Sequence, residues 1–209
     1  MRKKRINPFW LSLSILLSAV ILVLCFFAGR GGTLRLEADG DAQEVVSRFF
    51  NAVTAANYPE AYACLSDYSA LGLENEPDSP TGRTLRRALQ ESYGFTLVGD
   101  CVVDKLSAVQ RVDLRALDLK AVESAVAQEV DAAAEELVAE RPTEEIYDEN
   151  MQYLPSFTDE IYEAALARVL NHAEDFYATT QLELTLEYTG GAWKMRTSPA
   201  LFNALMGNA

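Results

Sequence analysis

An apolar stripe at helical spacing opens the folded part of the chain. Its residues are Val45, Val46, Phe49, Phe50 and Val53. They predict a helix that begins after Asp39 or Asp41, because an Asp side chain accepts hydrogen bonds from the first free amides of a helix. We expect Asn57 to end this helix in the left-handed conformation. Pro59 then suits the first turn of a second short helix, where no amide donor is needed.

A polar loop that contains glycine and proline follows the second helix. Ser79 or Thr81 can cap a third short helix in residues 81–92. Two segments rich in Val and Leu come next, residues 94–104 and 107–117. Their composition and spacing predict two strands.

From residue 118 the apolar period changes from two residues to about three and a half, which indicates helix. A helix of some twenty residues is predicted to end at Pro142, and another to begin at Thr158 or Asp159. The apolar stripes are Leu119, Val122, Val126, Val130, Ala133 and Leu137 in the first helix, and Ile161, Ala165, Val169, Ala173 and Phe176 in the second. The stripes predict an antiparallel helical hairpin over residues 118–177 that partly rests on the sheet.

Strand-like alternation returns in residues 180–189 and 192–197, which the pair Gly190-Gly191 separates. Two glycines between two strands are typical of a tight β-hairpin turn. The last segment, residues 198–207, predicts a short closing helix.

The charges on these strands predict their order in the sheet. Glu183 and Glu187 share one face of the strand 180–189. Cations lie on the corresponding faces of two other strands: Arg111 and Arg115 in residues 107–117, and Lys194 and Arg196 in residues 192–197. Opposite charges on neighbouring strands stabilise a sheet by roughly 0.2–1 kcal/mol per pair. We therefore expect strand 180–189 to lie between the other two.

The N-terminus has the pattern of a membrane anchor. Residues 1–8 include Arg2, Lys3, Lys4 and Arg5, and the next twenty residues, 9–28, carry no charge. At about 1.5 Å per residue, such a helix spans the roughly 30 Å hydrocarbon layer. Basic residues stay on the cytoplasmic side. We expect a cytoplasmic tail (1–8), a transmembrane helix (9–28), a glycine-rich linker (29–40) and an extracytoplasmic domain (41–209).

Two other interpretations of this N-terminus remain open. A cleaved signal peptide also has a basic start and an apolar middle, although that middle is usually about 7–15 residues long. A lipid-modified Cys25 would need a small residue before it, where the sequence has Leu24.

The charge of the predicted domain limits its partners. The whole chain has a formal net charge of −13, with 18 Lys and Arg against 31 Asp and Glu. The first 39 residues hold six of the cations and two of the anions, so residues 40–209 have 12 cations, 29 anions and a net charge of −17. Such a domain repels nucleic acid, and we expect no nucleic-acid partner.

Two segments resemble the cone-shaped nuclear-transport-factor-like superfamily. RFFNAVTAANYPEAYACLSD is similar to its opening pair of helices, and LTLEYTGGAWKMRTSPALFNALMG to the closing hairpin of exported bacterial members. The resemblance covers most of residues 41–117 and 178–206. Many of those members are single-pass or lipid-anchored proteins of unknown function.

Together, the pattern and the resemblance predict an α+β fold of the cystatin or nuclear-transport-factor-like kind. A transmembrane helix precedes short helices packed on a curved, four-stranded antiparallel sheet. The helical hairpin is inserted between the second and third strands.

The resemblance implies that catalytic members hold an acid/base group in a pocket between sheet and helices, as in ketosteroid isomerase. Here Asp113, Glu183 and Glu187 are expected to point outward, Asp100 can point either way, and His172 is expected on a hairpin surface. The acidic stretch from Asp148 lacks the glycine and the final Glu of a calcium-binding EF-hand. We therefore assign no catalytic, cofactor-binding or metal-binding residue.

The expected function is correspondingly non-catalytic. Five aromatic residues can fill the core or line a small apolar pocket: Phe50, Tyr62, Tyr93, Phe95 and Trp193. We expect a membrane protein that binds a partner protein, an envelope component or a small apolar ligand, and the hairpin 118–177 is the first candidate for a protein partner. The alternative is an isomerase or hydrolase that uses the pocket. Cys64 and Cys101 are expected to be buried free thiols, although an exported compartment permits them to pair.

Overall fold

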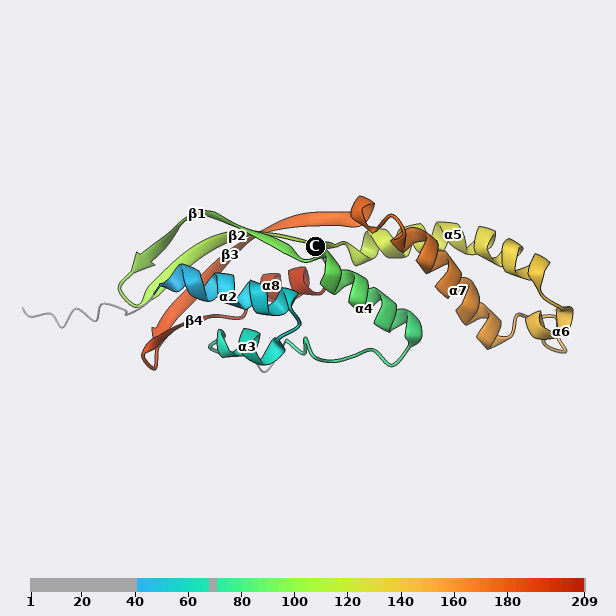
Figure 1. The fold of residues 1–209 in the computed structure, drawn as a ribbon, viewed down its shortest axis with the longest axis horizontal. Coiled ribbons are helices and arrows are strands. Elements are labelled where there is room, and N and C mark those ends of the chain that lie inside the picture. The colour runs from blue at the N-terminus through green and yellow to red at the C-terminus, as the bar shows by residue number, and fades with distance from the viewer. Residues whose placement is uncertain (1–40, 68–70, 209) are drawn as a thin grey trace, which may run out of the picture. The chain divides into compact units, whose positions relative to one another are not determined.

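Four antiparallel strands form one sheet in the order β1-β2-β3-β4, in a computed structural model that describes residues 41–67 and 71–208 (Figure 1). The strands are β1 (Gly94–Asp104), β2 (Ser107–Leu117), β3 (Tyr177–Thr189) and β4 (Ala192–Met195). The α-helices of the described residues are α2 (Ala42–Thr54), α3 (Tyr58–Ala63), α4 (Pro80–Ser92), α5 (Leu119–Glu140), α6 (Thr143–Ile146), α7 (Pro155–Leu170) and α8 (Pro199–Leu205). The predicted α+β class is therefore confirmed.

The predicted tail (1–8), transmembrane helix (9–28) and linker (29–40) lie outside the described residues. None of the helices within the described part of the chain has both the length and the apolar character that crossing a membrane requires.

The order of the strands agrees with the prediction from their charges. Arg111 of β2 lies opposite Glu183 of β3, with 3.6 Å between Nε and Oε2. On the other side of β3, Glu187 lies opposite Lys194 and forms an ion pair with Arg196 at 3.3 Å. All of these side chains lie on the outer face, while the leucines that alternate with the acids of β3 are buried. Strand β4 ends at Met195, two residues earlier than expected.

The core lies between the sheet and three helices. Helix α2 packs against β1 and β4, α4 against β2, and α8 against β2 and β3. Apolar side chains meet there and are almost fully buried: Phe49, Leu114, Leu117, Leu184, Leu186, Met195, Leu201 and Leu205. Burial of this apolar surface is the main term that stabilises the fold.

The corner between α2 and α3 corrects one prediction. Ala56, not Asn57, takes the left-handed conformation, with φ of 54°. The amide of Asn57 donates to the carbonyl of Ala52 at 2.8 Å, as expected one residue beyond a left-handed helix end. The Asn57 side chain accepts a hydrogen bond from the amide of Glu60 and so caps α3. Asparagine suits this position because its oxygen satisfies a free amide of the next helix.

The helical hairpin is inserted between β2 and β3, as predicted. Helices α5 and α7 lie side by side and antiparallel, with α6 between them in the chain (Figure 1). Helix α7 begins at Pro155, earlier than the expected Thr158 or Asp159, because proline suits a first helical turn.

The end of the second predicted stripe lies outside α7. Helix α7 stops at Leu170, so Ala173 and Phe176 belong to a separate 3₁₀ turn, η1 (Ala173–Phe176). This turn contacts β2, and α7 packs against α4.

Candidate functional site

The five aromatic residues predicted for a pocket have packing partners in the structure. Phe50 stacks on Phe95, with ring centroids 5.2 Å apart. Tyr93 is buried, and its hydroxyl donates a hydrogen bond to the carbonyl of Leu205. Burial raises the pKa of Tyr93 to about 12. Phe50, Phe95 and Tyr93 thus join the helices to the strand β1.

Tyr62 and Trp193 occupy other positions. The Tyr62 hydroxyl donates to Glu74 and accepts a hydrogen bond from the amide of Leu73 at 2.9 Å. Desolvation, together with the hydrogen bond to Glu74, raises the pKa of Tyr62. Trp193 is buried against the edge of Tyr188, with centroids 5.5 Å apart.

Four cavities of about 400, 490, 420 and 460 Å³ open among the described residues. None of these four is lined by the five predicted aromatic residues. Asp100 is exposed, next to a bulge in β1 at which Gly99 has φ of 68°. His172 is exposed, as expected for a hairpin surface. Cys64 is buried, Cys101 is partly buried, and both thiols are free.

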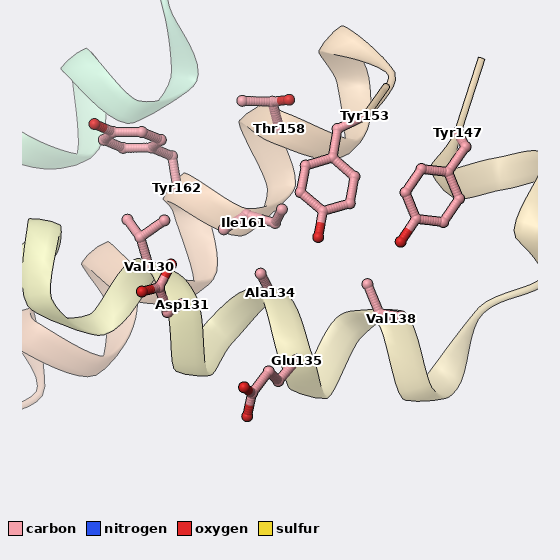
Figure 2. A pocket seen from close by; sticks show the side chains of 10 residues that line it. All are labelled: Val130, Asp131, Ala134, Glu135, Val138, Tyr147, Tyr153, Thr158, Ile161 and Tyr162. Atoms are coloured by element: carbon pink, nitrogen blue, oxygen red, sulfur yellow. The ribbon is translucent and has the colours of Figure 1, made fainter. Parts of the chain in front are cut away.

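The cavity of about 400 Å³ is a groove at the end of the helical hairpin (Figure 2). One side is formed by Val130, Ala134 and Val138, which recur every four residues of α5 and so share a face. On the other side, Figure 2 shows the rings of Tyr147, Tyr153 and Tyr162. The groove therefore combines an apolar row with a tyrosine wall, and we call it the tyrosine groove.

A short turn holds two of the tyrosines in place. The amide of Leu154 donates to the carbonyl of Ile146 at 2.9 Å, and the rings of Tyr147 and Tyr153 stack 5.3 Å apart. The carboxylate of Asp148 accepts hydrogen bonds from the amides of Asn150 and Gln152 at 2.8 and 2.9 Å. These hydrogen bonds lower the pKa of Asp148. The turn is thus fixed by its own side chains and backbone.

The same contacts concern the acidic stretch from Asp148, which lacks the glycine and the final Glu of a calcium-binding EF-hand. The Asp148 carboxylate is occupied by backbone amides, as in a turn-capping Asp. Among the described residues, no group of three or more His, Cys, Asp or Glu side chains is placed to hold a metal ion.

The tyrosine groove is exposed although it is apolar. The exposed fractions of Tyr153 and Tyr162 are 43% and 49%, and that of the nearby Met151 is 69%. Helix α5 has 22 residues, so at about 1.5 Å per residue its two ends are roughly 33 Å apart. The hairpin leaves and rejoins the sheet at the pair Leu117 and Tyr177, and the groove therefore lies far from the sheet.

The negative charge of the protein is concentrated on this hairpin. Residues 118–177 contain 16 Asp and Glu but only three Lys and Arg, a net charge of −13. The remaining residues of the chain contain 15 of each and are neutral. Both arginines of the hairpin form internal ion pairs: Arg141 with Glu145 and Glu160, and Arg168 with Glu129 and Glu136.

Two of the acidic residues belong to the tyrosine groove. Asp131 and Glu135 lie one helical turn apart on α5 and are exposed. Neither forms an ion pair with a cation of the described residues. Desolvation and the neighbouring Tyr147 raise the pKa of Tyr153, and the charge of Asp131 adds to this. The groove thus has an unneutralised acidic edge on its α5 side, across from the tyrosine wall.

A second cavity of about 420 Å³ adjoins the base of the hairpin. It is lined by Leu85 of α4, Leu119 and Val122 of α5 and Leu166 of α7, and Tyr162 lines both this cavity and the tyrosine groove. Its lining is mainly aliphatic, which suits an apolar side chain better than a charged one.

The sequence did not reveal the tyrosine groove. Tyr147 and Tyr153 lie in a polar segment without helical or strand periodicity, between the predicted end of one helix at Pro142 and the predicted start of the next. A signal was present in the excess of tyrosines near acidic residues, but only the fold brings them to the row on α5.

No protein family model matches this chain, and no curated protein or solved structure is significantly similar to it. The class of the protein therefore rests on the fold itself. That class is an α+β domain with an acidic helical hairpin between its second and third strands.

Proposed function

We propose that the chain is a single-pass bacterial membrane protein whose extracytoplasmic domain binds a partner protein through the hairpin 118–177. In this proposal residues 9–28 anchor the chain in the membrane, and the N-terminus is cytoplasmic. The domain 41–209 is a nuclear-transport-factor-like module that serves as a scaffold without catalysing a reaction. The apolar run, the basic residues before it and the resemblance at both ends of the domain support this assignment.

One observation carries the proposed binding role: an apolar groove with exposed tyrosines at the far end of the hairpin. Exposed aromatic residues that rim a hollow are typical of protein interaction sites. Tyrosine is enriched among the residues that contribute most to binding, because its ring offers a large rigid surface and a hydroxyl. The core of the fold needs neither Tyr153 nor Tyr162, since both rings are about half exposed.

Affinity purification of the tagged full-length protein from its native membrane tests this role. The variant Tyr153→Ala with Tyr162→Ala should lose a specific partner that the unchanged protein retains. The matched control is Val102→Ala with Val103→Ala, which truncates exposed apolar residues at the turn between β1 and β2. Loss of the partner from both variants, or from neither, would contradict binding through the groove. Circular dichroism of each variant checks that the fold is kept.

A further inference from the structure

We propose that the tyrosine groove binds a cationic, partly apolar segment of a partner protein. Apolar side chains of that segment lie on Val130, Ala134 and Val138, while its Lys or Arg side chains lie between the tyrosine wall and the edge formed by Asp131 and Glu135. This inference names the chemistry of the partner and rests on the proposed function.

The shape of the groove supports a peptide segment. Three apolar positions spaced four residues apart extend over about 12 Å of α5, since each residue adds about 1.5 Å. A volume of about 400 Å³ is within the usual range of ligand sites. An elongated apolar row accepts several side chains of one segment, as in other grooves that bind peptides.

The negative charge of the hairpin favours a positively charged partner segment. Its net charge of −13 attracts cations and repels acidic peptides, nucleic acid and anionic lipid. The arginines of the hairpin are already engaged with Glu129, Glu136, Glu145 and Glu160. Asp131 and Glu135 line the groove on its α5 side, and neither has an ion-pair partner among the described residues. A cation from a partner satisfies them with no loss of an existing ion pair.

The tyrosine wall adds a second contact for the same cation. A guanidinium or ammonium group over the face of a tyrosine ring is attracted by the electrons of the ring. Tyr153, Tyr162 and Asp131 line the same cavity, so a ring and a carboxylate can act on one cationic side chain. An anionic or purely apolar segment forms neither the contact with the ring nor the contact with the carboxylate.

A labelled octapeptide of alternating Leu and Lys is a suitable probe. The full-length protein is placed in nanodiscs of zwitterionic lipid, and fluorescence anisotropy is measured against empty nanodiscs. We expect saturable binding of the Leu/Lys peptide and at least about tenfold weaker binding of a Leu/Glu peptide of the same length. Equal binding of both peptides would overturn the assignment of charge.

Two double variants separate the groove from general attraction. Asp131→Lys with Glu135→Lys should weaken binding of the Leu/Lys peptide by about tenfold or more. The control, Glu140→Lys with Glu163→Lys, makes the same change in charge at exposed hairpin positions outside the lining of the groove. It should change the affinity by less than about threefold. Similar losses in both variants would overturn binding in the groove and leave only diffuse attraction to the hairpin.

A third variant keeps the inference testable if one of the double variants fails to fold. Tyr153→Ala keeps the charges and should still weaken binding by about fivefold, because it removes the ring beside the cation. Unchanged binding by this variant would count against the tyrosine wall. If the intact protein binds neither peptide, the inference fails, whereas the proposed function is decided separately by the purification of a native partner.

Discussion

Tyr93 shows how one buried side chain connects distant parts of this chain. It lies directly before β1, and its hydroxyl donates to the carbonyl of Leu205 in α8. We expect Tyr93→Phe to lower the free energy of unfolding at pH 7 by about 1 kcal/mol, since the carbonyl loses its donor. Urea unfolding measures this. Tyr162→Phe is the control, because that side chain is half exposed and should change stability little.

The same residue predicts a dependence on alkaline pH. Burial raises the pKa of Tyr93 to about 12, from an ordinary value of 10.0. The neutral phenol is therefore favoured in the folded state, and its contribution is fully present below about pH 10. As the pH rises toward 12, the unfolded state ionises first and this stability is lost. Tyr93→Phe should remove that part of the decline, and an identical decline in the variant would contradict the assignment.

At the scale of elements, the sequence predicted the sheet more closely than the hairpin. The bounds of β1 and β2 agree with the prediction because both segments are rich in Val and Leu, and β2 also alternates apolar with polar residues. The order of β3 between its neighbours followed from pairs such as Arg111 with Glu183. The start of α7 was missed because Leu154 provides no side-chain cap, and the helix is signalled only by Pro155.

The tyrosine groove was not predictable in the same way. Its wall depends on the turn that stacks Tyr147 on Tyr153, which is set by contacts of the Asp148 carboxylate with nearby amides. Periodicity carries no information about such a turn. The predicted pocket residues were chosen because they are aromatic, and this property alone does not distinguish the core from a binding surface.

The C-terminal helix fixes the base of the hairpin through Gly207. The carbonyl of Gly207 accepts a hydrogen bond from the amide of Leu119, the first residue of α5. Gly207 has φ of 66°, and a Cβ there would lie 2.6 Å from the carbonyl oxygen of Leu117. Gly207→Ala should therefore lower the free energy of unfolding by roughly 3 kcal/mol, from strain and steric overlap together.

Gly191 provides the comparison for this prediction. It also has a positive φ, 83°, but a Cβ there meets nothing within 4 Å. Gly191→Ala should thus cost only the strain of the left-handed conformation, about 1–2 kcal/mol. Both variants are measured by thermal or urea unfolding. Equal losses would contradict a steric cost at Gly207 beyond the strain of its left-handed conformation.

For the whole molecule, the distribution of charge matters more than its total. The hairpin 118–177 alone accounts for the net charge of −13, and the rest of the chain is neutral. On the sheet, acids meet cations across the strands, so charge there supports the fold. On the hairpin, 16 acids share only three Lys and Arg residues, so most acids have no cation to pair with. The fold keeps this repulsion within the hairpin, and the uncompensated charge produces a strong negative electrostatic potential around the tyrosine groove.

This imbalance predicts that salt stabilises the two halves of the described domain differently. Raising NaCl from 10 to 500 mM shortens the screening length from about 30 Å to below about 8 Å, so repulsion among the hairpin acids weakens. Amide hydrogen exchange in α5 and α7 should slow by about threefold or more, since like charges no longer favour local opening. Exchange in β2 and β3 should change little, because screening weakens attractive pairs there as well. Equal slowing in the hairpin and in the sheet would show a general effect of salt on folding. It would contradict the prediction that repulsion among its own acids destabilises the hairpin at low salt.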